Sequence, residues 1–83
     1  MEQKLGEVIH FYPKVNAAAI LLTDGDLAVG DVIRISGHGM EFEQRVESLE
    51  LDRQPVQRIA KGCVAAIKVV EKVRPGAIVC KIG

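Results

Sequence analysis

A turn rich in glycine and aspartate leads directly into an alternating strand between Gly25 and Gly37, and this segment constrains the fold most. Ile33 and Ile35 fall on one face of an extended chain, with polar neighbours on the other face. Gly25 and Gly30 can take the positive φ that tight turns need, and the adjacent aspartates can hydrogen-bond the backbone. The segment therefore predicts a tight turn that feeds a half-buried strand.

Strand signals recur along the whole chain. The segments with this pattern are Leu5 to Tyr12, Val15 to Leu22, Val32 to Ser36, Phe42 to Leu51, Cys63 to Val70 and Ala77 to Ile82. Propensity alone allows a helix at the alanine-rich second segment, but it has only about eight residues between Pro13 and the next turn, a length typical of strands. Gly37, His38 and Gly39 predict a hairpin connection.

Two places depart from simple alternation. In the fourth segment the apolar positions change from even to odd numbers, which predicts a β-bulge or sharp bend near Glu47 and Ser48. Between Asp52 and Gly62 the strand pattern stops. This stretch is interpreted as a loop or single turn that plugs a barrel end with Val56 and Ile59, with a functional helix as the alternative.

The order of the segments predicts an all-β fold. About six short strands with turns between them and no long helix are typical of a small closed antiparallel β-barrel. The 83 residues form one predicted domain, 1–83, without a linker or repeat. A chain of this size buries only roughly 60% of its unfolded surface, so a large active-site cleft is not expected.

Charge and hydropathy exclude several classes of function. Eleven basic and eleven acidic residues give zero net charge, so no global field attracts nucleic acid or an anionic membrane. The N-terminal residues Met1 to Gly6 lack the apolar run of a signal peptide, and no stretch is long and apolar enough to span a membrane as a helix. We therefore expect a cytoplasmic location and no membrane partner.

Residues suited to catalysis are few. Cys63 and Cys80 lie in apolar runs and are interpreted as small buried hydrophobic residues, with a cross-strand disulfide as the alternative. Folding could bring His10 to either thiol, or His10 and His38 to both as zinc ligands, but no spacing matches a known motif. The sequence predicts a protein that is not an enzyme and has no cofactor and no metal.

A basic cluster is expected at one end of the barrel. If successive strands are antiparallel, their connections alternate between the two ends. One end then collects Lys14, His38, Lys72 and Arg74, whereas the other mixes aspartates with Arg53, Arg58 and Lys61. The four residues of the first end are the predicted contact for RNA phosphate or an acidic partner, with ordinary solubilising turns as the alternative.

Two strands are more apolar than one small core requires. Ala17 to Leu22 and Val64 to Ile67 are apolar on both faces. One outer face is therefore predicted to dock on a protein partner or on a second copy, giving a monomer or a weak homodimer.

Four blocks of sequence resemble a known domain. They are Gly25 to Ile35, Val46 to Leu49, Lys61 to Ile67 and Val73 to Val79, and they are similar in order and spacing to the second, β-barrel domain of translational GTPases of the elongation factor Tu type. The resemblance implies a Greek-key barrel that does no chemistry and binds tRNA, ribosomal RNA or a translation-linked protein. The chain departs from the family because it has neither a GTPase domain nor a GxxxxGKS/T loop.

A similar barrel occurs as an accessory segment of larger enzymes, including relatives of the collagenase-like U32 peptidases. The resemblance therefore leaves two functions open. One is an RNA-binding module related to translation factors, and the other is a module that docks on a larger enzyme or self-associates.

Overall fold

The computed structural model describes residues 2–82, which form strands and turns without a helix. Met1 and Gly83, which belong to the predicted domain 1–83, lie outside the described residues. The strands are β1 (Glu2–Tyr12), β2 (Ala17–Leu22), β3 (Leu27–Ala28), β4 (Val32–Gly37), β5 (Met40–Arg45), β6 (Leu49–Leu51), β7 (Gln54–Val56), β8 (Arg58–Ile59), β9 (Val64–Lys68) and β10 (Ile78–Ile82).

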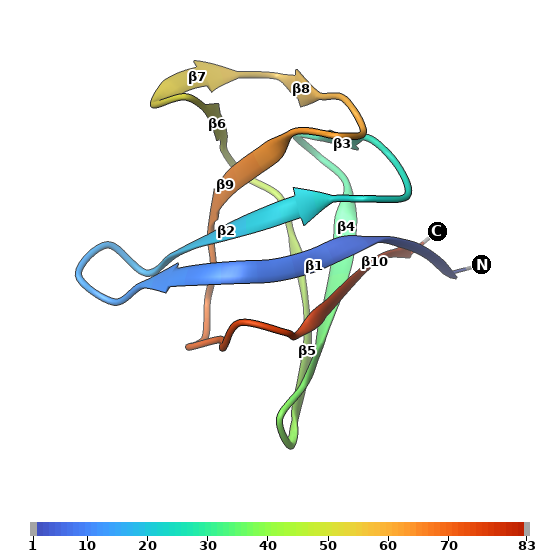
Figure 1. Ribbon diagram of the computed structural model, residues 1–83, viewed down its shortest axis with the longest axis vertical. Coiled ribbons are helices and arrows are strands. Elements are labelled where there is room, and N and C mark those ends of the chain that lie inside the picture. Colours follow the sequence, from blue (N-terminus) through green and yellow to red (C-terminus); the bar gives the residue numbers. More distant parts are fainter. Residues whose placement is uncertain (1, 83) are drawn as a thin grey trace.

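Eight of the strands form one sheet in the order β5-β4-β10-β1-β2-β9-β6-β7, and β3 and β8 form a separate two-stranded sheet. The large sheet curls around the core, and β1 and β10, the first and last strands of the chain, lie side by side within it (Figure 1). Every pairing is antiparallel. The predicted all-β, antiparallel class is therefore confirmed.

The prediction of a closed barrel is wrong. β5 and β7 are the two ends of the sheet, and no strand formed by residues 2–82 pairs with their outer sides. β7 is short and contains Pro55, which has no N–H to donate to another strand. At the other end a side chain takes the place of a ladder: Gln44 of β5 donates from Nε2 to the Lys68 carbonyl at 2.8 Å and accepts the Val70 N–H on Oε1 at 2.9 Å. The gap between β5 and the end of β9, which we term the seam, is therefore bridged by the side-chain amide of Gln44 instead of by paired strands.

The change of alternation near Glu47 and Ser48 marks a change of partner strand. β5 pairs with β4 as far as Arg45, whereas β6 pairs with β7 and β9. Between them Val46 is buried and exchanges backbone hydrogen bonds with Gly30 and Asp31. The position of the bend is confirmed, but the predicted single fourth strand is two strands in different parts of the sheet.

The segment between Asp52 and Gly62 does bury apolar residues as predicted, but it does so from short strands and not from a loop or single turn. Ile59 is buried and Val56 packs against the core. Both lie in short strands, since Val56 pairs with Leu49 and Ile59 pairs with Leu27. The segment is therefore two short strands joined and flanked by turns, and it contains no helix.

The turns follow the sequence signals closely. Asp31 accepts the Ala28 N–H on its carboxylate at 3.0 Å and donates its own N–H to the Ala28 carbonyl at 3.1 Å. Gly30 has a φ of 98°, whereas Gly25 does not take the positive φ allowed for it. His38 and Gly39 form the two-residue β4–β5 hairpin turn, as expected, and both have positive φ.

The core lies on the inner face of the curled sheet. Its most deeply buried large side chains are Leu5, Val8, Ile20, Leu22, Leu27, Ile33, Ile35, Val46, Leu49, Ile59, Ile67 and Val73. Among residues 2–82 no polar or charged residue is buried, so the core is built from apolar side chains.

Candidate functional site

The cysteine and histidine residues do not meet. His10 lies opposite Ala19 and packs its ring on that of Tyr12, with centroids 4.4 Å apart. Cys80 lies opposite Lys4, toward the other end of β1. Cys63 accepts the Leu22 N–H on its carbonyl, also away from His10. No cysteine–histidine pair suited to nucleophilic catalysis is therefore assembled by these residues.

Both cysteines are free and partly buried, so they are not the fully buried residues expected, and the alternative disulfide is not formed. Burial raises the pKa of the Cys80 thiol, and the charge of Glu2 acts in the same direction. A raised pKa makes a thiol less nucleophilic at neutral pH. Within residues 2–82 no three His, Cys, Asp or Glu side chains are grouped so that they could hold a metal ion.

The predicted basic end is brought together only in part. The His38 ring lies 2.9 Å from the Pro75 carbonyl, which places the β4–β5 turn against the segment that carries Lys72 and Arg74. Lys14 lies in the exposed β1–β2 turn. These residues are all exposed, and their role in binding RNA or an acidic partner stays a prediction.

The opposite end contains a local ionic cluster. Asp26 accepts the Lys61 N–H at 2.9 Å and pairs with Arg58 at 2.6 Å. These bonds hold the pKa of the Asp26 carboxyl below its ordinary value, with the backbone bond from Lys61 as the largest cause. The cluster joins the β2–β3 turn to β8, and this is a structural role.

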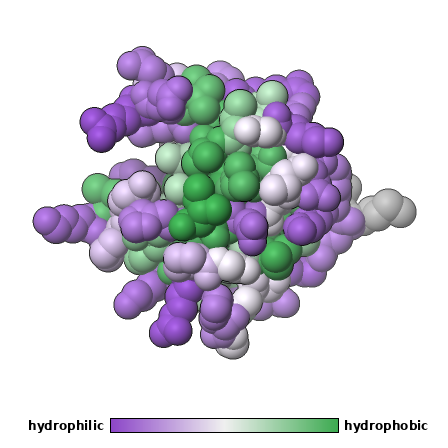
Figure 2. Space-filling model, viewed as in Figure 1, coloured by the Kyte–Doolittle hydropathy of each residue, from purple (hydrophilic) through white to green (hydrophobic). Residues whose placement is uncertain are grey.

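The most distinctive surface is the outer face of β2 and β9, the two strands predicted to be apolar on both faces. The register places Leu21 opposite Val64 and Ala19 opposite Ala66. The side chains of these residues point away from the core because their neighbours Ala18, Ile20, Ala65 and Ile67 point into it. Figure 2 shows a hydrophobic stripe crossing this face of the molecule. We term Ala17, Leu21, Val64 and Ala66 the apolar face; Ala19 lies among them in the register but is itself buried.

The same side of the sheet is polar over β4 and β5. Arg34 pairs with Glu43 at 2.9 Å and also with Glu2. The hydrogen bond from Arg34 to Glu43 raises the pKa of the arginine. Charged side chains thus gather over β4 and β5, the polar half of the outer surface, although β10 beside them presents Ile78, Cys80 and Ile82 on the same face.

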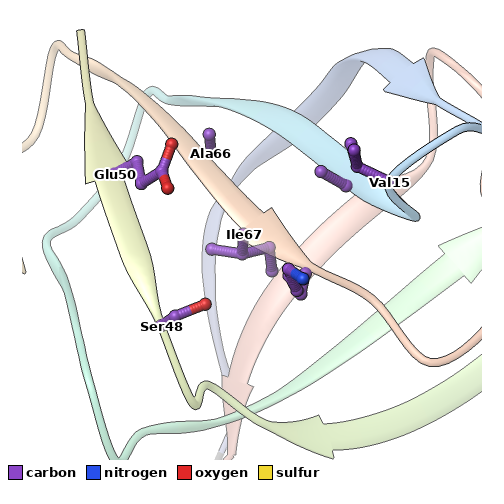
Figure 3. Close-up of a pocket in the computed structure, with 7 residues that line it drawn as sticks. Val15, Ser48, Glu50, Ala66 and Ile67 are labelled. Atoms are coloured by element: carbon purple, nitrogen blue, oxygen red, sulfur yellow. The ribbon is translucent and has the colours of Figure 1, made fainter. Parts of the chain in front are cut away.

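A hollow of about 210 Å³ lies at the edge of the apolar face. It is lined by Val15, Ala17, Ser48, Glu50, Ala66, Ile67 and Lys68. Figure 3 shows Glu50 of β6, and Ser48 just before that strand, projecting toward the strand that carries Ala66 and Ile67. Sequence reasoning missed Ser48, Glu50 and Lys68 because the pairing of β6 with β9 is not recorded in the local alternation of either segment.

Comparison with known proteins finds relatives among proteases. The chain is 33% identical over 72 residues to a collagenase of Porphyromonas gingivalis, which covers 86% of this chain and 20% of that protein. It is 35% identical over 74 residues to an uncharacterized protease of Methanocaldococcus jannaschii, covering 88% of this chain and 18% of the protease. The chain thus spans about a fifth of the length of the curated relatives that it matches. No family model matches.

A solved structure decides the fold. The C-terminal domain of a U32 peptidase from Geobacillus thermoleovorans superposes with a TM-score of 0.89 at 17% identity, covering 98% of this chain and 93% of that domain. The chain has the fold of this U32 domain. A selenomethionine variant of the same U32 domain gives a TM-score of 0.86.

The resemblance to the second domain of elongation factor Tu is therefore wrong. The structural neighbours are U32 peptidase C-terminal domains, and the sequence relatives are named collagenase or protease. One of the four blocks that suggested a translation factor, Gly25 to Ile35, contains a turn in which Asp31 bonds back to Ala28. Any fold that needs this turn before a strand can use the same residues.

Proposed function

We propose that the chain is a non-catalytic accessory domain that docks through its apolar face onto the remainder of a U32-type peptidase, which we term the peptidase body. The observation that carries the proposal is the contrast on the outer surface, apolar over β2 and β9 and ionic over β4 and β5. Interface centres are poor in charged residues, as this face is.

The comparisons support the choice of partner. The chain corresponds to about a fifth of each curated relative, so in those proteins the matching segment is joined to a much longer chain. The solved neighbour is a C-terminal domain of a larger peptidase. A small domain that is covalently attached to such a protein has a neighbouring surface available at high effective concentration.

The structure offers little support for catalysis by this chain. Its histidines and cysteines are separated, and every buried side chain among residues 2–82 is apolar. Chemistry would be performed by the peptidase body, and this domain would contribute binding and position.

The test is binding between two separate polypeptides. One is this chain, and the other is the body of a U32-type peptidase, such as the Porphyromonas gingivalis collagenase, without the segment that matches this chain. Val64→Glu places a charge at an exposed position of the apolar face and should weaken binding at least about tenfold. Glu41→Lys, on the polar half of the outer surface, should leave binding unchanged.

Loss of binding with Glu41→Lys but not with Val64→Glu would contradict the choice of surface. Absence of binding by the intact chain to the peptidase body would contradict the proposal itself. Sedimentation of the chain alone distinguishes docking on a peptidase from self-association, because only the latter gives a dimer without the body.

A further inference from the structure

The hollow beside the apolar face has the size of a single side chain. Its volume is about 210 Å³. Sites for drug-sized ligands occupy roughly 300–1,000 Å³. An engineered apolar cavity of about 150 Å³ is large enough to bind benzene. The hollow is therefore too small for a cofactor and large enough for one branched aliphatic or aromatic side chain.

The sheet topology builds this hollow. β6 pairs with β9 only at Glu50 opposite Ala66. Beyond that pair, β9 reaches Lys68, whose carbonyl is held by Gln44 of β5 instead of by β6. The strands separate at this point, and the space between them is lined mainly by aliphatic groups of Ala17, Ala66 and Ile67.

The rim of the hollow carries two charges of opposite sign. Glu50 lies across from Ala66, and Lys68 lies two positions further along β9 on the same face. Within residues 2–82 neither side chain has an ion-pair partner, in contrast to Arg34, Arg58 and Lys81. The two charges are thus available to a partner.

We propose that the hollow is an anchor pocket for one aliphatic or aromatic side chain on the surface of the peptidase body, flanked there by a basic residue facing Glu50 and an acidic residue facing Lys68. The inference rests on the proposed docking function and specifies the chemistry of the partner surface. A side chain that fills a desolvated pocket supplies most of the binding energy in many interfaces, and rim charges fix the register of the partner.

A fragment titration tests the pocket without the peptidase body. N-acetyl-leucinamide and N-acetyl-phenylalaninamide are added to the chain at millimolar concentrations, with N-acetyl-glycinamide as the control, and methyl resonances are followed by NMR. The expected result is saturable shifts of Ala17, Ala66 and Ile67 with the two apolar fragments and none with the control. Absence of shifts, or shifts centred on another part of the sheet, would overturn the pocket.

Binding of the peptidase body tests the role of the pocket in docking. Ala66→Phe fills the hollow and should weaken binding at least about tenfold. Glu50→Lys and Lys68→Glu are exposed changes that should each accelerate dissociation or slow association, with the effect diminishing at high salt. Thermal unfolding of each variant shows whether the sheet is intact.

The two proposals fail in different ways. If the intact chain binds and Ala66→Phe binds equally well, the anchor pocket is wrong and docking stands. If the intact chain does not bind the body, docking on the peptidase is wrong, and the fragment titration decides by itself whether the hollow accepts an apolar side chain.

Discussion

At the scale of single residues, Gly6 shows how the absence of a side chain permits two strands to pair. A Cβ at this position would lie 1.9 Å from the Leu21 carbonyl oxygen. That oxygen belongs to the backbone of β2, so it cannot move aside as the end of a flexible side chain could. Gly6 also lies where the register of β1 shifts against β10. At Gly30 space is not the constraint, because a Cβ there would meet no atom within 4 Å. The constraint is the backbone, whose φ of 98° disfavours every residue other than glycine.

The two glycines therefore predict different costs. Gly6→Ala forces the backbones of β1 and β2 apart and should lower the free energy of unfolding by about 3 kcal/mol or more. Gly30→Ala should cost about 1–2 kcal/mol, the strain of the left-handed conformation. Urea denaturation of both variants measures the difference. Equal stabilities of the two variants would show that β1 and β2 do not approach as closely as described.

Asp26 predicts a dependence of stability on pH. The pKa of its carboxyl is lowered in the folded protein by the Lys61 N–H and then by Arg58. Its contribution is therefore complete above the ordinary aspartate pKa of about 3.9 and is lost as the pH falls through the lower value of the folded state. Asp26→Asn should remove this component, so the stability of the variant should fall less steeply below about pH 4. Parallel acid-unfolding curves would contradict this assignment.

At the scale of elements, the seam between β5 and β9 depends on one side chain. Gln44 uses both ends of its amide, one to the Lys68 carbonyl and one to the Val70 N–H. Direct pairing of the two strands would hydrogen-bond more backbone N–H and C=O groups than one amide does. It would require β5 and β9 to lie side by side over several residues. The amide spans the gap where the sheet stops short of closure.

Removing that amide should loosen the seam. Gln44→Ala should lower the free energy of unfolding by about 1–2 kcal/mol, and the Val70 amide should exchange faster with solvent. Gln44→Glu keeps the acceptor for Val70 but loses the donor for Lys68, so its effect should be smaller on Val70 exchange. Glu41→Ala, on the same strand, is the control, with an expected change within about 0.5 kcal/mol. Unchanged exchange of Val70 in Gln44→Ala would contradict the role of the seam.

The elements show what could be predicted from the sequence. Local signals were sufficient for the turn at Asp31 and the hairpin at His38, because each turn is specified by residues within a few positions. The bend after Arg45 was also visible as a change of phase. Pairing partners were not predictable, because alternation defines which face is buried and says nothing about which strand lies beside it.

The site follows the same division. The apolar character of β2 and β9 on both faces was visible in the sequence, and the structure places the two strands side by side. The hollow was not predictable, since it arises where Glu50 meets Ala66 from a distant segment and the strands then separate. Closure of the barrel was predicted wrongly for a related reason, because closure depends on which strands pair at the edges of the sheet, and alternation carries no information about pairing partners.

At the scale of the whole molecule, two different surfaces share one sheet. The inner face supplies the core, and the outer face is divided between an ionic half and an apolar half. Within residues 2–82 no helix is long and apolar enough to cross a membrane. The fold is that of the C-terminal domain of a U32 peptidase, and under the proposed docking the apolar part of the outer face would contact protein while the ionic part stays in water.

Methyl cross-saturation NMR tests the docking claim most directly. The methyl-labelled chain is bound to the protonated peptidase body, and saturation of the body identifies the methyl groups in contact with it. We predict intensity loss at Ala17, Leu21, Val64 and Ala66 and none at Val32 or Ile78, which lie over the polar half of the outer face. Loss at Val32 and Ile78 with none on the apolar face would contradict the account.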